Sequence, residues 1–86
     1  MCKKLNVEEF NLLVDKTQKY MAVHGKYVRL GQAYMNCLNN IREDMYVAIT
    51  ATKYDPFYKN DVIPDFFRYI GDEDVNNFLN LKSNER

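Results

Sequence analysis

The sequence predicts an all-α protein, a compact bundle of four to five short helices. Apolar side chains recur at helical spacing, and the few Gly and Pro residues fall at or near the borders of most periodic segments. No internal repeat or low-complexity stretch interrupts this pattern. With 86 residues the chain has room for one core, so we expect a single domain over 1–86, with frayed ends at about 1–5 and 82–86.

The first predicted helix covers residues 7–24. Asn6 followed three residues later by Glu9 has the pattern of a capping box, and Gly25 marks the C-terminal end. At 100° per residue, one side of this helix collects the side chains that we expect in the core: Phe10, Leu13, Val14, Thr17, Tyr20 and Met21.

The second predicted helix covers residues 27–41 and has two distinct faces. Its apolar face holds Tyr27, Leu30, Tyr34, Met35, Cys37, Leu38 and Ile41. Gly31 lies within that face and predicts a close approach by another helix or by a ring, because glycine otherwise disfavours a helix. The polar face holds Arg29, Gln32, Asn36, Asn39 and Asn40. Asn is a poor helix former, so these amides indicate side chains used for hydrogen bonding.

A third helix is predicted over about 43–52, with Met45, Val47 and Ile49 as its apolar residues, although its β-branched end leaves a strand as the alternative. Residues 54–61 have the composition of a turn, since Pro56 disfavours helix at the residue before it.

A fourth helix over 62–70 carries Pro64 in its first turn and directs Phe66, Phe67 and Ile70 inward. Asp72 then caps a final short helix packed through Val75, Phe78 and Leu79.

Composition limits the classes of function. Apolar residues make up 47% of the chain, more than a disordered segment contains. The net charge of zero does not favour nucleic acid or an anionic membrane as a partner, and no apolar run reaches the ~20 residues of a membrane span. With only Cys2 and a predicted buried Cys37, we expect a reduced, cytoplasmic protein.

Charge is unevenly distributed along the chain. Residues 1–42 contain seven Lys and Arg against three acids, whereas residues 43–86 contain five against nine. The two halves either attract each other within one fold or form a dipolar surface that docks a partner by its acidic end. The former is the simpler interpretation.

No set of residues has the pattern of a catalytic or metal site, so we expect a non-enzymatic protein without a cofactor. His24 is the single histidine, and its position near a helix end is explained by favourable interaction with the helix dipole. Asp72, Glu73 and Asp74 lack the alternation and the Gly of a calcium loop, and acids are ordinary at a helix start.

The polar residues of the second helix and the turn are the candidate interaction residues: Arg29, Gln32, Asn36, Asn40, Asp55, Phe57, Tyr58 and Asp61. In the favoured interpretation the turn folds back, Phe57 enters the core beside Gly31, and Arg29 or Gln32 bonds the turn. The alternative is that both elements face solvent together as a partner-binding surface. A third interpretation is base readout in DNA by Arg29, Gln32, Asn36 and Asn40, but Glu43 and Asp44 stand where a basic rim is needed.

These residues also carry a resemblance. The segment Arg29-Leu30-Gly31-Gln32-Ala33-Tyr34-Met35-Asn36-Cys37-Leu38, followed by Asp55-Pro56-Phe57-Tyr58, Asp61 and Phe66, resembles a pattern R-x-G-Q-x-x-x-N-x-L … D-P-F-Y-x-x-D. Short uncharacterised proteins that look like products of tailed bacteriophages carry this pattern, and the resemblance covers residues 29–67. It implies an accessory protein that acts in the host bacterial cytoplasm by binding a host or phage protein.

The sequence thus favours a protein-binding module that modulates its partner, with a DNA-binding accessory protein as the alternative. The small core and spare apolar residues such as Leu12 and Val23 also predict self-association, most simply as a two-fold homodimer.

Overall fold

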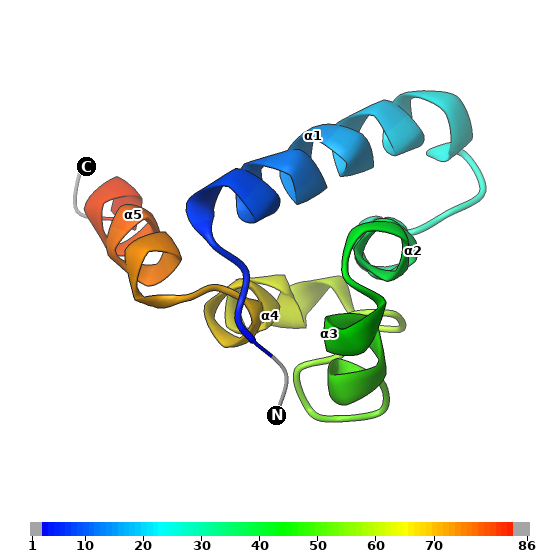
Figure 1. The fold of residues 1–86 in the computed structure, drawn as a ribbon. Helices are drawn as coiled ribbons and strands as arrows, with labels where there is room; N and C mark the ends of the chain where they lie inside the picture. Colours follow the sequence, from blue (N-terminus) through cyan, green and yellow to red (C-terminus); the bar gives the residue numbers. More distant parts are fainter. Residues whose placement is uncertain (1–2, 84–86) are drawn as a thin grey trace.

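The structure is a computed structural model that describes residues 3–83. These residues form α1 (Val7–His24), α2 (Leu30–Ile41), α3 (Glu43–Ile49), a 3₁₀ helix η1 (Asn60–Val62), α4 (Ile63–Ile70) and α5 (Glu73–Ser83). The predicted all-α bundle is confirmed. Figure 1 looks along α2, with α1 running across the view above it and α5 at the opposite side of the bundle. Cys2 and the predicted frayed residues 84–86 lie outside the described residues.

Helix α1 begins and ends where the sequence predicts. The side chain of Asn6 accepts a hydrogen bond from the backbone N–H of Glu9 at 2.8 Å, and the Glu9 carboxylate accepts one from Asn6 at 3.1 Å, which completes the capping box. Gly25 is the C-terminal cap. Phe10, Leu13 and Thr17 are buried, so the core face of this helix is also confirmed.

Helix α2 is the central helix, and it starts three residues later than predicted. Its buried residues are Gly31, Ala33, Tyr34, Met35, Cys37 and Leu38. Residues 25–29 are not helical, and Arg29, which has an extended backbone, serves as the N-cap. Tyr27 consequently lies in the connection between helices and is 87% exposed rather than buried. Leu30, in the first turn, is 38% exposed, so its predicted burial is also wrong, and Ile41 is half-buried.

Helix α3 is shorter than predicted because the chain reverses direction directly after Ile49. Thr50 is extended and Ala51 adopts a positive φ of 65°, a left-handed conformation that no helix can continue through. Met45 and Ile49 are buried one turn apart, as expected. Val47 lies on the other side of the helix and is 67% exposed.

Four aromatic rings join three helices in the core. The ring of Phe67 on α4 lies 5.1 Å from Phe10 on α1 and 5.1 Å from Tyr34 on α2, both edge to face. Phe66, which is fully buried, lies 6.0 Å from Tyr34. Edge-to-face rings at these separations are favourable. The predicted inward direction of Phe66 and Phe67 is thereby confirmed.

The segment before α1 is held between α4 and α5. Leu5 is fully buried; its N–H donates to the carbonyl of Ile70 at 2.7 Å, and its carbonyl accepts from Asp72 at 2.9 Å. The predicted frayed segment therefore does not extend to residue 5, because one apolar side chain and two backbone hydrogen bonds fix it. Asp72 also caps α5 through the N–H of Val75 at 3.0 Å, as predicted. Phe78, expected to pack, is 43% exposed.

Replacing Leu38 with alanine tests this core. Leu38 is fully buried in the central helix, so Leu38→Ala removes packed methyl groups and should lower the free energy of unfolding by about 2–5 kcal/mol. Leu12→Ala is the matched control, because Leu12 is 45% exposed on α1, and its cost should stay within about 1 kcal/mol. Urea denaturation measures both. Equal small effects would contradict the placement of α2 at the centre.

Candidate interaction surface

The turn at 54–61 packs directly on the start of α2. A Cβ atom built on Gly31 would lie 1.9 Å from the carbonyl oxygen of Pro56, so only glycine permits this approach. Pro56 is fully buried at this point. The predicted close contact at Gly31 is confirmed, but the ring beside it belongs to Pro56, and Phe57 is half-buried against the edge of the core.

Asn60 caps α2 from a distant part of the chain. Arg29, the N-cap residue, makes no capping hydrogen bond with its own side chain. Instead the Oδ1 atom of Asn60 accepts the backbone N–H of Gly31 at 2.9 Å. The first N–H groups of a helix have no partner within the helix, so this bond satisfies one of them. The start of α2 therefore depends on η1, which the sequence pattern alone did not indicate.

Asp55 organises the backbone of the turn. Its two carboxylate oxygens accept the N–H of Ala51 at 2.8 Å and the N–H of Phe57 at 2.9 Å. These bonds hold the chain on both sides of Asp55. Both Asp55 oxygens thus bond backbone N–H groups within the 51–57 segment.

Arg29 connects the turn to α2 on the outside of the molecule. Its Nη2 atom donates to the carbonyl of Phe57 at 3.5 Å, which matches the expectation that Arg29 bonds the turn backbone. The Arg29 guanidinium carbon lies 6.0 Å from the centre of the Tyr58 ring, and the Phe57 and Tyr58 rings meet edge to face at 4.8 Å. The guanidinium and the two rings thus lie together at one end of the bundle.

The amide face of α2 is only partly brought into this arrangement. Asn36 is half-buried and donates to the hydroxyl of Tyr20 on α1 at 3.2 Å, so it joins two helices and does not reach the turn. Gln32 is half-buried, and Asn40 is exposed. Asn40 follows Arg29 by eleven residues, which is about 16 Å along the helix. The eight candidates therefore do not form one compact site, and Asp61 is exposed on η1.

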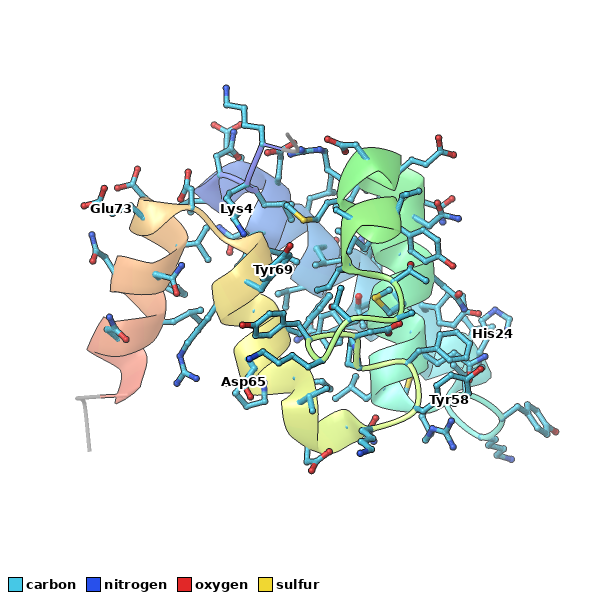
Figure 2. The ribbon with its side chains drawn as sticks, turned by 90° about the horizontal axis from the view of Figure 1, so that it is seen from below. Lys4, His24, Tyr58, Asp65, Tyr69 and Glu73 are labelled. Atoms are coloured by element: carbon cyan, nitrogen blue, oxygen red, sulfur yellow. The ribbon has the colours of Figure 1, made fainter. Side chains whose placement is uncertain are left out.

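The structure adds two exposed cations and a second exposed ring to this end. Tyr27 is 87% exposed and Tyr58 is 76% exposed, and Lys26 and Lys59 beside them are exposed as well. We call Lys26, Tyr27, Arg29, Tyr58 and Lys59 the aromatic end. Figure 2 shows Tyr58 and His24 toward the same end of the molecule, away from Glu73 and Lys4. Sequence periodicity missed Tyr27 because it assigned the ring to the buried face of a longer helix.

A polar cluster at the other end has a structural explanation. Arg42 bonds the carboxylates of Glu9 at 3.2 Å and Asp44 at 2.8 Å, and it donates to the carbonyl of Lys3. The hydrogen bond with Asp44, followed by Glu9, raises the pKa of the Arg42 guanidinium above its ordinary value, although partial burial acts in the opposite direction. Arg42 thereby joins the chain before α1 to the starts of α1 and α3.

Other reactive side chains are not gathered into one place in the described part of the chain. Residues 3–83 contain no group of three or more His, Cys, Asp and Glu that could hold a metal ion. The His24 ring lies 4.6 Å from Tyr20, and Cys37 is buried as a free thiol. Burial, with a smaller contribution from Cys37, raises the pKa of Tyr34. None of the helices within these residues is long and apolar enough to cross a membrane.

The contact at Gly31 predicts that replacing this glycine with alanine destabilises the protein, which is the opposite of the usual effect in a helix. Gly→Ala normally stabilises a helix by about 1 kcal/mol. Gly31→Ala should instead destabilise the protein by about 1–3 kcal/mol, because the new methyl group meets the Pro56 carbonyl. Asn39→Ala, at an exposed position of the same helix, is the control and should be neutral or stabilising. Thermal unfolding of both variants decides the matter, and a stabilised Gly31→Ala protein would refute the contact.

The cap from Asn60 predicts a difference between two substitutions at one position. Asn60→Ala removes the oxygen that accepts the Gly31 N–H and should cost about 0.5–2 kcal/mol. Asn60→Asp keeps an acceptor and adds a negative charge near the start of α2, so stability should be retained. Urea denaturation compares them, and equal losses for both variants would exclude capping as the cause.

Comparison of the chain with family models, curated proteins and solved structures found no match. The resemblance of residues 29–67 to short phage proteins therefore stays a prediction, and the geometry of the chain itself carries the functional argument below.

Proposed function

We propose that this chain is a small non-enzymatic accessory protein that binds and modulates a host or phage protein in the bacterial cytoplasm. The aromatic end is the surface through which it does so. Two of its five residues, Arg29 and Tyr58, belong to the set that sequence analysis singled out. The resemblance of residues 29–67 to phage proteins supports the class of partner.

One observation carries the proposal: two tyrosine rings are left in solvent at the same end of a small protein. Tyr27 is 87% exposed and Tyr58 is 76% exposed. Tyrosine is enriched where proteins contact each other, because its ring offers apolar area and its hydroxyl offers a hydrogen bond. Arg29, a second residue type favoured at such contacts, lies between the α1–α2 connection and the turn.

Rigid support for these rings strengthens the proposal. Tyr58 follows a turn that is fixed by the Asp55 hydrogen bonds and by Pro56 against Gly31. A side chain on a fixed turn loses little backbone entropy when a partner binds, and this increases affinity. The backbone N–H of Tyr27 donates to the carbonyl of His24 at 2.9 Å, and this bond fixes the chain on the other side of the surface.

DNA binding through the amide face has less support. A helix that reads bases needs several side chains directed into one groove. Asn36, at the middle of the proposed set, donates its hydrogen bond to Tyr20 within the protein. The residues that follow α2 are Arg42, Glu43 and Asp44, and Arg42 is engaged with Glu9 and Asp44.

Capture from bacterial lysate tests the proposal. The wild-type chain should retain a partner protein for which the Tyr27→Ala/Tyr58→Ala variant loses affinity at least tenfold, since truncating a tyrosine that is a hot spot costs about 2 kcal/mol. Leu12→Ala is the control, because Leu12 is an exposed apolar residue about 18 Å along α1 from His24. Circular dichroism verifies that all variants fold. A partner held equally by the wild type and the double tyrosine variant would contradict the use of the aromatic end.

A further inference from the structure

We infer that the aromatic end binds an acidic protein segment, one that carries Asp and Glu together with an apolar side chain. The inference rests on the proposed function and names the chemistry of the partner. It follows from the distribution of charge between the two ends of the bundle, together with the shape of the surface around Tyr58.

Exposed cations surround the two tyrosines. Lys26 and Arg29 lie on the connection before α2, and Lys53 and Lys59 lie on the segment between α3 and η1. The acids nearby in the sequence are Asp55 and Asp61. Asp55 is half-buried, and both of its oxygens accept backbone N–H groups, at 2.8 Å and 2.9 Å. Asp61 is exposed, so four cations stand against one exposed carboxylate, and the surface that a partner meets carries an excess of positive charge.

Seven of the eleven acids in residues 3–83 lie at the other end, where they outnumber the cations Lys3, Lys4 and Arg42. Glu9, Arg42 and Asp72 line one shared hollow there, and Asp44 bonds Arg42, so the starts of α1, α3 and α5 lie together. Exposed carboxylates at these three starts are Glu8, Glu43, Asp44, Glu73 and Asp74. Figure 2 shows Glu73 far from Tyr58. The net charge is zero, but positive and negative charge are separated between the two ends of the bundle. Such a protein orients a charged partner and directs an acidic one to the aromatic end.

Two hollows flank the Arg29 and Tyr58 side chains. One has a volume of about 450 Å³ and is lined by Lys26 and Arg29, with the apolar Met21 and Leu30. The other, of about 520 Å³, is lined by Tyr58, Lys59, Lys53 and Val62, and also by Asp55, whose two oxygens accept backbone N–H groups. Each hollow combines apolar atoms with cations. An apolar side chain of the partner fits such a hollow, while neighbouring carboxylates reach the cations.

A single-stranded nucleic acid is the competing occupant, since exposed rings can stack on bases and cations can meet phosphates. Such binding draws its affinity from phosphate neutralisation along a basic groove. Here the cations Lys26, Arg29, Lys53 and Lys59 stand at the aromatic end, and the excess of acids at the starts of α1, α3 and α5 repels a polyanion that extends toward it. A short acidic protein segment avoids that repulsion, so the observations favour it.

Titration of the full ¹⁵N-labelled chain with defined probes tests the inference. The first probe is a short synthetic peptide of Asp and Glu with one Phe and one Leu. The second has the same sequence with Asn and Gln in place of every acid, and the third is oligothymidylate. We expect the acidic peptide to shift the amide signals of Lys26, Tyr27, Tyr58 and Lys59, and the neutral peptide to bind at least about tenfold more weakly.

Matched charge reversals locate the effect. Lys59→Glu should weaken binding of the acidic peptide by about three- to tenfold, whereas Lys16→Glu should leave it unchanged. Lys16 is exposed on α1 and carries the same charge, so the two variants have equal net charge. The difference should diminish as salt screens the cations.

Four results would overturn the inference: no signal shifts with the acidic peptide, equal affinity for the neutral peptide, equal effects of the two reversals, or tighter binding of oligothymidylate. If lysate capture depends on Tyr27 and Tyr58 while the acidic peptide fails to bind, the proposed function stands and the acidic chemistry is wrong. If capture does not depend on the tyrosines and the peptide fails as well, both are wrong.

Discussion

The contact between Gly31 and Pro56 is the constraint on which the rest of the structure depends. With 1.9 Å between a hypothetical Cβ and the Pro56 oxygen, a side chain at position 31 cannot coexist with the turn in its present position. The approach brings Asn60 within reach of the first turn of α2, and it places Phe57 so that Arg29 can bond its carbonyl. One absent side chain therefore determines where α2 starts and where Tyr58 emerges.

The two ends of the bundle are stabilised by different kinds of interaction. At the aromatic end, order comes from close backbone contact and from side chains that bond N–H groups, as Asp55 and Asn60 do. At the other end, Arg42 gathers two carboxylates and a carbonyl, while its side chain is only 15% exposed. Removal from water strengthens such ionic contacts, but a buried charge that lacks partners is strongly destabilising. Several acceptors around one guanidinium avoid that cost. The acids remaining in water give this end its charge.

Local signals made part of the fold predictable, and long-range contacts decided the remainder. The capping box of Asn6 and Glu9 involves neighbours in sequence, so the limits of α1 were correct. Gly31 was recognisable as a close contact because glycine stands out in an apolar helix face. The partner residue was misassigned, since Phe57 has the larger apolar ring, yet Pro56 is the residue whose backbone faces α2. No periodicity could place Asn60 on the Gly31 N–H, because 29 residues separate them.

For the candidate site too, local signals made some residues predictable and long-range contacts decided the others. Sequence spacing identified Arg29 and Tyr58, but it assigned Tyr27 to a buried helix face because Tyr27 continues the spacing of the apolar residues. The helix begins only at Leu30, because the backbone of Arg29 is extended, and spacing does not reveal this. The pairs Lys26–Tyr27 and Tyr58–Lys59 are neighbours in the sequence, but the two pairs come to the same end of the bundle only because the turn packs on α2.

The clamp on Leu5 has a consequence for synthesis on the ribosome. Leu5 pairs with Ile70 and Asp72, so it meets its partners only after residues 70–72 have been synthesised. Contacts of such long sequence separation slow folding, because a large loop must close before they form. While the nascent chain grows, Leu5 stays uncovered and α1 lacks its anchor. The backbone contacts that fix Leu5 therefore form only after residue 72 has left the exit tunnel.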